Sequence, residues 1–232
     1  MPVVPTMLSA LVATAGPSSL RWVLSAGAPL PEALRAAAEA RLGCAVREGY
    51  GLTEASFSTI DAPPEVTTPG TVGRAVGGVE VRLVAGEVQL RGPNVMIGYL
   101  DDAAATAEAF TADGWLRTGD VGELAAGRLR IVDRIKDIIL RGGHTIYPGE
   151  VEAALAAHPA VAAVAVVGRA HRHLGQEVVA HVVLRDAVEL RELEAWARER
   201  LATYKVPSAF VAHEALPLGP SGKVLKRALV AI

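Results

Sequence analysis

Hydrophobic and polar positions in the first part of the chain alternate between short apolar runs and one amphipathic stretch. LRWVLSAG (20–27) ends at Gly-Ala-Pro, as a buried strand entering a loop does. PEALRAAAEARLG (31–43) predicts a helix that begins near Pro31 and stops at Gly43. AVREGYG (45–51) predicts a second strand that runs into a glycine-flanked turn. Strand, helix and strand of this length indicate a parallel crossover, whose ligands collect beyond the strand carboxyl ends.

The pattern changes over residues 71–133 to short strands joined by tight turns. VEVRLVAGEVQLRG alternates apolar and polar residues on both sides of Ala85–Gly86, which predicts a hairpin. VGELAAGRLRIVD predicts a second hairpin that turns at Ala126–Gly127. AAATAEAF (103–110), between them, predicts a short helix. We expect this part to form a small barrel-like or sandwich-like β section.

The third section begins near VDRIKD (132–137), the predicted domain boundary. EVEAALAAHP and ELRELEAWARERL predict helices, and AVAAVAVVG and EVVAHVVL predict strands. A final extended segment completes an α+β domain of about 100 residues, a plausible independent size. The predicted fold class is therefore α/β and α+β. Residues 1–133 form the end of an α/β sheet subdomain with the small β-barrel section, and residues 134–232 form the compact α+β domain.

Composition excludes several classes of protein. The chain has a formal net charge of −2 and 51% hydrophobic residues, so nothing indicates a nucleic-acid or acidic-membrane partner. The single cysteine, Cys44, excludes an internal disulfide, and without a nearby histidine it is expected to be a small buried filler. His171 and His173 lack two further ligands for zinc. No basic residue precedes Arg21 and no apolar run is long enough to cross a bilayer, which indicates a cytoplasmic protein.

Two stretches carry groups suited to a nucleotide, each with a simpler alternative. In EGYGLTEA (48–55), Tyr50 can stack on a base, Thr53 can donate to a phosphate and Glu54 can hold Mg²⁺. The alternative is a glycine turn with a core tyrosine and a helix start. In GWLRTGD, Asp120 can accept the two hydroxyls of a ribose or can simply cap a turn.

Two later stretches carry basic groups. In VDRIKDIILRGG, Arg134 can pair with ribose or phosphate, or belong to a solvated face beside a buried strand. In LPLGPSGKVLKRAL, Pro-Ser-Gly presents Lys223 from a tight turn, from which it can reach a phosphate. Most lysines near a chain terminus have no such role.

Taken together and in order, SAGAPL, EGYGLTE, GWLRTGD, VDRIKDIILRGG and PSGKVLKR resemble the adenylate-forming (AMP-binding) superfamily over essentially the whole chain. That superfamily includes acyl-CoA synthetases, peptide-synthetase adenylation domains and luciferases. The text ILRGGHTIYPGEVE resembles the acyl-CoA synthetase, or fatty-acid–CoA ligase, branch. Two departures, His144-Thr145 and the LPLGPSGK sequence without a lysine-threonine pair, touch no named catalytic position.

The resemblance implies a two-step reaction and a role for each matching residue. ATP and a carboxylic acid give acyl-AMP and pyrophosphate, and the thiol of coenzyme A then displaces AMP. Residues 134–232 would be a mobile C-terminal lid. The implied roles, by position in this sequence, are Gly27 and Ala28 lining the adenine and acyl pocket, Tyr50 on adenine between Gly49 and Gly51, Thr53 at the α-phosphate, Glu54 at Mg²⁺, Asp120 at the ribose with Arg134 assisting, Lys136 as hinge, Gly143 in the segment brought to the thiol channel, and Lys223 as catalytic lysine.

One expected part of the family site is missing. The 232 residues contain neither a Ser/Thr/Gly-rich loop ending in Pro-Lys-Gly nor a GxxxxGK[ST] cradle for the β- and γ-phosphates. Three interpretations follow: a truncated ligase that is inactive alone, a half-enzyme completed by a separate N-terminal polypeptide, or a non-catalytic binding module. A sheet lacking neighbours is also expected to expose apolar surface around LRWVLSAG. The resemblance implies that the Ala/Gly-lined remnant of the acyl pocket permits an aliphatic or a small aromatic acid.

Overall fold

The structure, a computed structural model, describes residues 1–14, 19–219 and 222–230. The chain divides into two compact units, Met1–Ile131 and Val132–Ile232, and each is described by itself. The assignment of 1–133 to a large domain and 134–232 to a lid stays a prediction. No helix among the described residues is long and apolar enough to span a membrane, and a cytoplasmic location stays a prediction.

The first unit opens with a five-stranded sheet in the order β1-β2-β3-β4-β5. Its strands are β1 (Pro2–Val3), β2 (Trp22–Ser25), β3 (Ala45–Leu52), β4 (Ser56–Ile60) and β5 (Arg74–Ala75). The first three are parallel, as the crossover prediction required, and β4 and β5 continue antiparallel.

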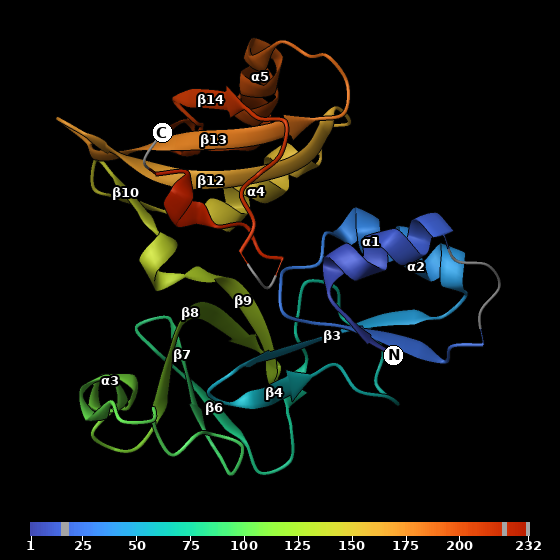
Figure 1. Cartoon of the computed structure of the whole chain (residues 1–232), viewed down its shortest axis with the longest axis vertical. Coiled ribbons are helices and arrows are strands. Elements are labelled where there is room, and N and C mark those ends of the chain that lie inside the picture. Colours follow the sequence, from blue (N-terminus) through green and yellow to red (C-terminus); the bar gives the residue numbers. More distant parts are fainter. Residues whose placement is uncertain (15–18, 220–221, 231–232) are drawn as a thin grey trace. The chain divides into compact units, whose positions relative to one another are not determined.

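Two helices pack against the parallel part of this sheet, α1 (Pro5–Thr14) and α2 (Glu32–Leu42). Figure 1 shows them side by side in blue. Helix α2 confirms the predicted helix and ends at Gly43, whose φ of 67° is left-handed and therefore favours glycine. The helices and strands enclose a core of six buried residues: Val3, Leu8, Val23, Ala38, Leu42 and Val46.

One expectation for this region needs correction and another needs narrowing. Within residues 20–27, Val23 and Leu24 are only 0% and 8% exposed, whereas Leu20, Trp22 and Ala26 are half-buried. Val23 packs in the core under the helices. Cys44 is half-buried rather than buried, packs at the margin of the same core, and has a thiol pKa raised by its burial.

The rest of the first unit is a four-stranded sheet in the order β6-β7-β8-β9. Its elements are β6 (Glu80–Val84), β7 (Glu87–Arg91), α3 (Ala103–Ala109), β8 (Leu116–Ala125) and β9 (Arg128–Arg134), the last of which crosses the unit boundary. Both predicted hairpins are confirmed. Their turns, Ala85–Gly86 and Ala126–Gly127, have positive φ at both positions, as two-residue turns of right-twisted hairpins require.

The β-barrel part of the prediction is wrong for this sheet. Within the described residues no pairing joins β9 back to β6, so the sheet stays open. Strand β9 instead exchanges backbone hydrogen bonds with the chain before β5: Val72 N donates to Leu129 O and Leu129 N donates to Gly73 O, both at 2.8 Å. The outer edge of β9 is thereby occupied. The mixed α/β and α+β fold class itself is confirmed.

The second unit contains a five-stranded sheet in which β11-β10-β13-β12 form one path and β14 pairs with β13. Its elements are η1 (Ile135–Asp137), β10 (Ile139–Arg141), β11 (His144–Ile146), α4 (Pro148–Ala156), β12 (Val161–His171), β13 (Gly175–Leu184), α5 (Leu190–Arg200), η2 (Thr203–Lys205), β14 (Ala209–Ala212) and η3 (Lys226–Ala228). The predicted order of helix, strand, strand, helix and extended segment is confirmed. Strands β12 and β13 form the long antiparallel pair in Figure 1, and α4 and α5 bury Val151, Leu155, Leu193 and Ala197.

Candidate functional site

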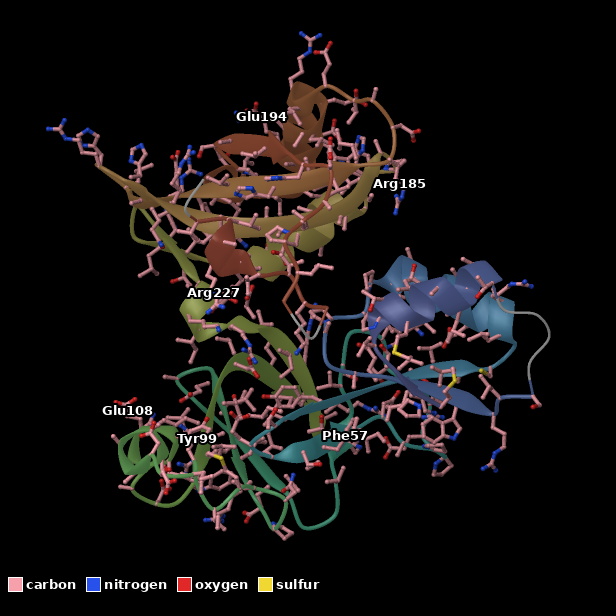
Figure 2. All side chains as sticks on the ribbon, in the orientation of Figure 1. Phe57, Tyr99, Glu108, Arg185, Glu194 and Arg227 are labelled. Atoms are coloured by element: carbon pink, nitrogen blue, oxygen red, sulfur yellow. The ribbon has the colours of Figure 1, made fainter. Side chains whose placement is uncertain are left out.

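Tyr50 lies where β3 turns back into β4. The register between the two strands shifts at Tyr50/Gly51, and Ser56 adopts a positive φ of 46° to close the turn. A Cβ on Gly51 would lie 1.8 Å from the Ser56 carbonyl oxygen, so only glycine fits there. A Cβ on Gly49 would lie 2.9 Å from the ring of Phe57, which Figure 2 labels on β4. The two glycines let the strands close around the tyrosine.

Tyr50 and Asp120 are brought together although they are 70 residues apart in sequence. The Tyr50 hydroxyl donates to Asp120 Oδ2 at 2.6 Å, and Asp120 is only 3% exposed. Thr118 fixes the strand beside it, because its Oγ1 accepts from Asp120 N at 3.1 Å and donates to Val88 O at 2.7 Å. An aromatic ring and an acidic acceptor therefore meet at the junction of the two sheets.

Thr53 and Glu54 lie in the turn that follows. Thr53 is exposed and Glu54 is half-buried. The Tyr99 hydroxyl donates to Glu54 Oε1 at 2.9 Å, and this bond raises the pKa of the Tyr99 phenol. The turn is not the start of a helix, which was the simpler alternative, but a strand-to-strand reversal. Sequence reasoning missed Tyr99, and no spacing signal links residues 54 and 99.

Gly27 and Ala28 lie in the loop just beyond the end of β2 and are exposed. Ser25 and Glu48 are partners in the parallel register, so the ends of β2 and β3 lie at the same edge of the sheet, as predicted. Gly27 has a φ of 87°, a left-handed value that favours glycine. The structure thus places these two residues and the Tyr50 turn at neighbouring strand ends.

Glu48, two residues before Tyr50, is the most perturbed acid near this edge. Burial raises the pKa of its carboxyl to about 7, while the positive charge of Arg35 opposes the rise and the charges of Glu32 and Asp61 add to it. Its carboxyl group therefore changes charge near neutral pH. Sequence reasoning gave Glu48 no role, because burial of a strand residue at a sheet end is not visible in its spacing.

The predicted residues of the second unit occupy turns and exposed positions. Lys136 is in η1, Gly143 is in the β10–β11 turn with a φ of 83°, and Lys223 follows Gly222; all three are exposed. Pro220 and Ser221 of the predicted lysine turn lie outside the described residues. Gly219 N donates to Lys223 O at 2.8 Å, so the backbone at the lysine is held.

The segment around Arg134 is anchored by the preceding aspartate. Asp133 Oδ1 accepts from Arg134 N at 2.8 Å, and Asp133 Oδ2 accepts from Gly149 N, in the first turn of α4, at 2.6 Å. This links the chain before Lys136 to the body of the second unit. The nucleotide and catalytic roles of all these residues stay predictions.

Two protein-family models match the chain. The model of the AMP-binding enzyme family matches residues 1–100, and the model of the AMP-binding enzyme C-terminal domain matches residues 150–223. The chain belongs to the adenylate-forming superfamily.

Curated relatives within the adenylate-forming superfamily are CoA ligases. A CoA ligase for a methyl-dioxo-octahydroindenyl propanoate from Rhodococcus jostii is 45% identical over 91% of this chain and 42% of its own length. A 2-succinylbenzoate–CoA ligase from Bacillus velezensis is 40% identical over 97% of this chain and 49% of its own. The chain spans about half the length of these relatives.

Solved adenylate-forming enzymes share the fold. ATP-bound MatB from Rhodopseudomonas palustris superposes with a TM-score of 0.94 at 30% identity, covering 99% of this chain and 50% of that one. The o-succinylbenzoate CoA synthetase MenE from Bacillus subtilis, in complex with an acyl-adenylate intermediate, gives a TM-score of 0.89 at 35% identity over 98% and 50% of the two chains. Both relatives were solved with adenine nucleotides.

Proposed function

We propose that this chain supplies one wall of the adenylate site of an acyl-CoA ligase, together with the domain that carries its catalytic lysine. The observation that carries the proposal is the 2.6 Å hydrogen bond between Tyr50 and Asp120. The two residues implied at the adenine and the ribose of AMP, from distant parts of the sequence, are in direct contact. Gly27 and Ala28 lie at the neighbouring strand end, where the adenine and acyl groups would meet.

In the complete enzyme, a carboxylate oxygen of the acid attacks the α-phosphorus of ATP. The bond from this phosphorus to the bridging oxygen breaks, pyrophosphate leaves, and acyl-AMP remains. In the second step the sulfur of coenzyme A attacks the acyl carbon, the bond to AMP breaks, and the thiol proton passes to solvent. Thr53 would donate to the α-phosphate, and Lys223 would offset the charge that builds up on its oxygens.

The residues present fit a divalent cation at Glu54. Its half-buried carboxylate accepts a hydrogen bond from the Tyr99 hydroxyl at Oε1, which leaves Oε2 for a metal ion. Mg²⁺ suits such a site, because it is commonly held by one or two carboxylates together with substrate phosphates. A bound Mg²⁺ would supply neutralisation of phosphate charge.

The second unit would act by moving. Lys223 and Gly143 would serve the two half-reactions in turn, with the chain around Lys136 as the hinge and Arg134 at the ribose. Hinge and lid steps of this kind often limit turnover. The exposure of Lys136, Gly143 and Lys223 supports such a role, because groups that are delivered to a ligand must not be buried within their own domain.

Coenzyme A is the favoured acyl acceptor because the curated relatives named above are CoA ligases. An amine is the second candidate, since an amide bond synthetase from Marinactinospora thermotolerans also superposes, with a TM-score of 0.89 at 32% identity. Assay products distinguish the two, a thioester in one case and an amide in the other.

The test is reconstitution. The chain is co-expressed with the part of the Rhodococcus jostii ligase that precedes the matched region, and carboxylate-dependent exchange of pyrophosphate into ATP is measured over a panel of aliphatic and aromatic acids. We expect exchange from the pair and none from the chain alone, which has no phosphate loop in its 232 residues.

Two variants of the pair make this test specific. Lys223→Ala should lower exchange by about 10²–10³-fold, the usual effect of removing one charge-stabilising group. Arg227→Ala, an exposed cation four residues away and labelled in Figure 2, should leave exchange unchanged. Absence of exchange from the pair, together with absence of AMP binding by the chain, would contradict the proposal.

A further inference from the structure

The turn that carries Thr53 and Glu54 is closed by its own backbone. Ala55 N donates to Leu52 O at 3.0 Å, and Ala55 is fully buried. These contacts fix the path of the chain, but they leave the three side-chain torsions of Glu54 undetermined. A glutamate in such a turn loses rotamer freedom only if something holds its carboxylate.

A second segment, residues 94–99, is hydrogen-bonded to the backbone of this turn. Met96 N donates to Glu54 O at 2.7 Å. The Asn94 amide donates to the carbonyl oxygens of Ala55 and Phe57, the latter at 3.1 Å. The backbone at and after Glu54 is therefore tied to a segment about 40 residues further along the chain.

The end of this segment reaches the Glu54 side chain. Tyr99 Oη donates to Glu54 Oε1 at 2.9 Å. Tyr99 is itself held, because its backbone N donates to Thr106 Oγ1, on α3, at 2.9 Å. A Cβ on Gly98 would lie 2.8 Å from the Thr106 methyl carbon, so glycine permits this close approach. Figure 2 labels Tyr99 beside α3.

We propose that Tyr99 is a positioning residue for a divalent cation: its hydroxyl holds one carboxylate oxygen of Glu54 and leaves the other as the metal ligand. The inference rests on the proposed function, in which Glu54 binds the cation that accompanies the nucleotide. Hydrogen bonds to a ligating carboxylate fix its orientation, and their loss commonly costs about 10–100-fold in metal affinity.

The metal test compares the full chain with Tyr99→Phe, Glu54→Gln and Tyr204→Phe. Tyr204 is a matched control: it is a partly exposed tyrosine of the second unit, 36% exposed against 42% for Tyr99. Mn²⁺ binding in the presence of AMP is measured by water-proton relaxation, and AMP binding is measured separately in chelator. We expect Tyr99→Phe to weaken Mn²⁺ binding about 10–100-fold, Glu54→Gln to abolish it, and Tyr204→Phe to leave it unchanged.

The outcomes separate the two proposals. AMP binding in chelator should be equal in wild type and Tyr99→Phe. Two results would overturn the positioning role and leave the adenylate site standing. In one, the wild-type chain binds AMP but no Mn²⁺. In the other, Tyr99→Phe binds Mn²⁺ as tightly as wild type. If AMP fails to bind and the reconstituted pair also shows no pyrophosphate exchange, the proposed function fails.

Discussion

The predicted nucleotide residues of the two units differ in how they are held. In the first unit Tyr50 and Glu54 each share a side-chain hydrogen bond with a residue far away in sequence. In the second unit Lys136 and Lys223 stand exposed at short helical or turn segments. One set is built into a hydrogen-bonded junction of two sheets, and the other is displayed on the surface.

This difference matches two separate tasks in the two-step reaction proposed above. A wall that binds adenine and ribose gains from preorganisation, because the geometry is then in place before the substrate arrives. A lysine that must leave between half-reactions gains from a backbone that is held while its side chain stays in solvent. Substitutions should therefore affect stability in the first set and only chemistry in the second.

The largest expected effect tests whether the units are separate cooperative bodies. Leu155 is fully buried in the core of the second unit. Leu155→Ala should lower the free energy of unfolding of residues 132–232 by about 2–5 kcal/mol through loss of packing and the cavity left behind. Hydrogen exchange read by mass spectrometry should locate the loss in that unit, and an equal loss in residues 1–131 would break the comparison.

A smaller effect should separate Tyr50 from Lys223 directly. Tyr50→Phe leaves the buried Asp120 carboxylate without the tyrosine hydroxyl, which should cost about 1–3 kcal/mol of unfolding free energy in the first unit. Lys223→Ala should change the stability of either unit by less than about 0.5 kcal/mol, because its side chain is exposed. Chemical denaturation measures the change in unfolding free energy in each variant. Equal losses in the two variants would contradict the proposed difference between the two sets of residues.

The smallest effect concerns pH and the second unit alone. His181 is buried, and its Nδ1 lies 2.8 Å from His213 Nε2. Burial, then the charges of His213 and Arg169, lowers the pKa of His181 below its ordinary value. The unfolded chain therefore takes up a proton first as the pH falls below about 6.5, and the stability of the second unit should fall from there down to the folded pKa.

Denaturation at a series of pH values checks this. His181→Gln should flatten the profile, while the exposed His173→Gln should keep it. A wild-type profile that is flat between neutral and mildly acid pH would contradict the role of the histidine pair. All six histidines of the chain lie in residues 132–232, so hydrogen exchange should locate the histidine-dependent change in that unit.

Much of the fold follows from local signals in the sequence. A turn with glycine at its second position, such as Ala85–Gly86, predicts a hairpin because two-residue turns need positive φ. The helix from Glu32 to Leu42 is bounded by a proline and a glycine. Helix α1 was missed although Pro5 stands in its first position, because its apolar residues follow no clear helical period. Strand β4 was missed because SFSTI lacks a clean alternation.

The candidate site was only partly visible in the sequence. Motif order identified Tyr50 and Asp120, but their contact depends on how two sheets meet and no spacing encodes it. Tyr99 and Asn94 escaped notice for the same reason: each acts on the turn at Glu54 from a distant segment. The expected barrel failed because β9 pairs with residues 72–73, a long-range contact that local patterns do not specify.

The close approach at Gly51 changes what this residue can tell about function. A side chain there would collide with the Ser56 carbonyl at 1.8 Å, so the β3–β4 reversal demands glycine whether or not a nucleotide ever binds. A descendant that had lost all catalysis would still keep it for as long as it kept the hairpin. The presence of Gly51 therefore reports common ancestry and the hairpin conformation. Retained catalytic function has to be tested at Tyr50, Asp120 and Glu54 instead.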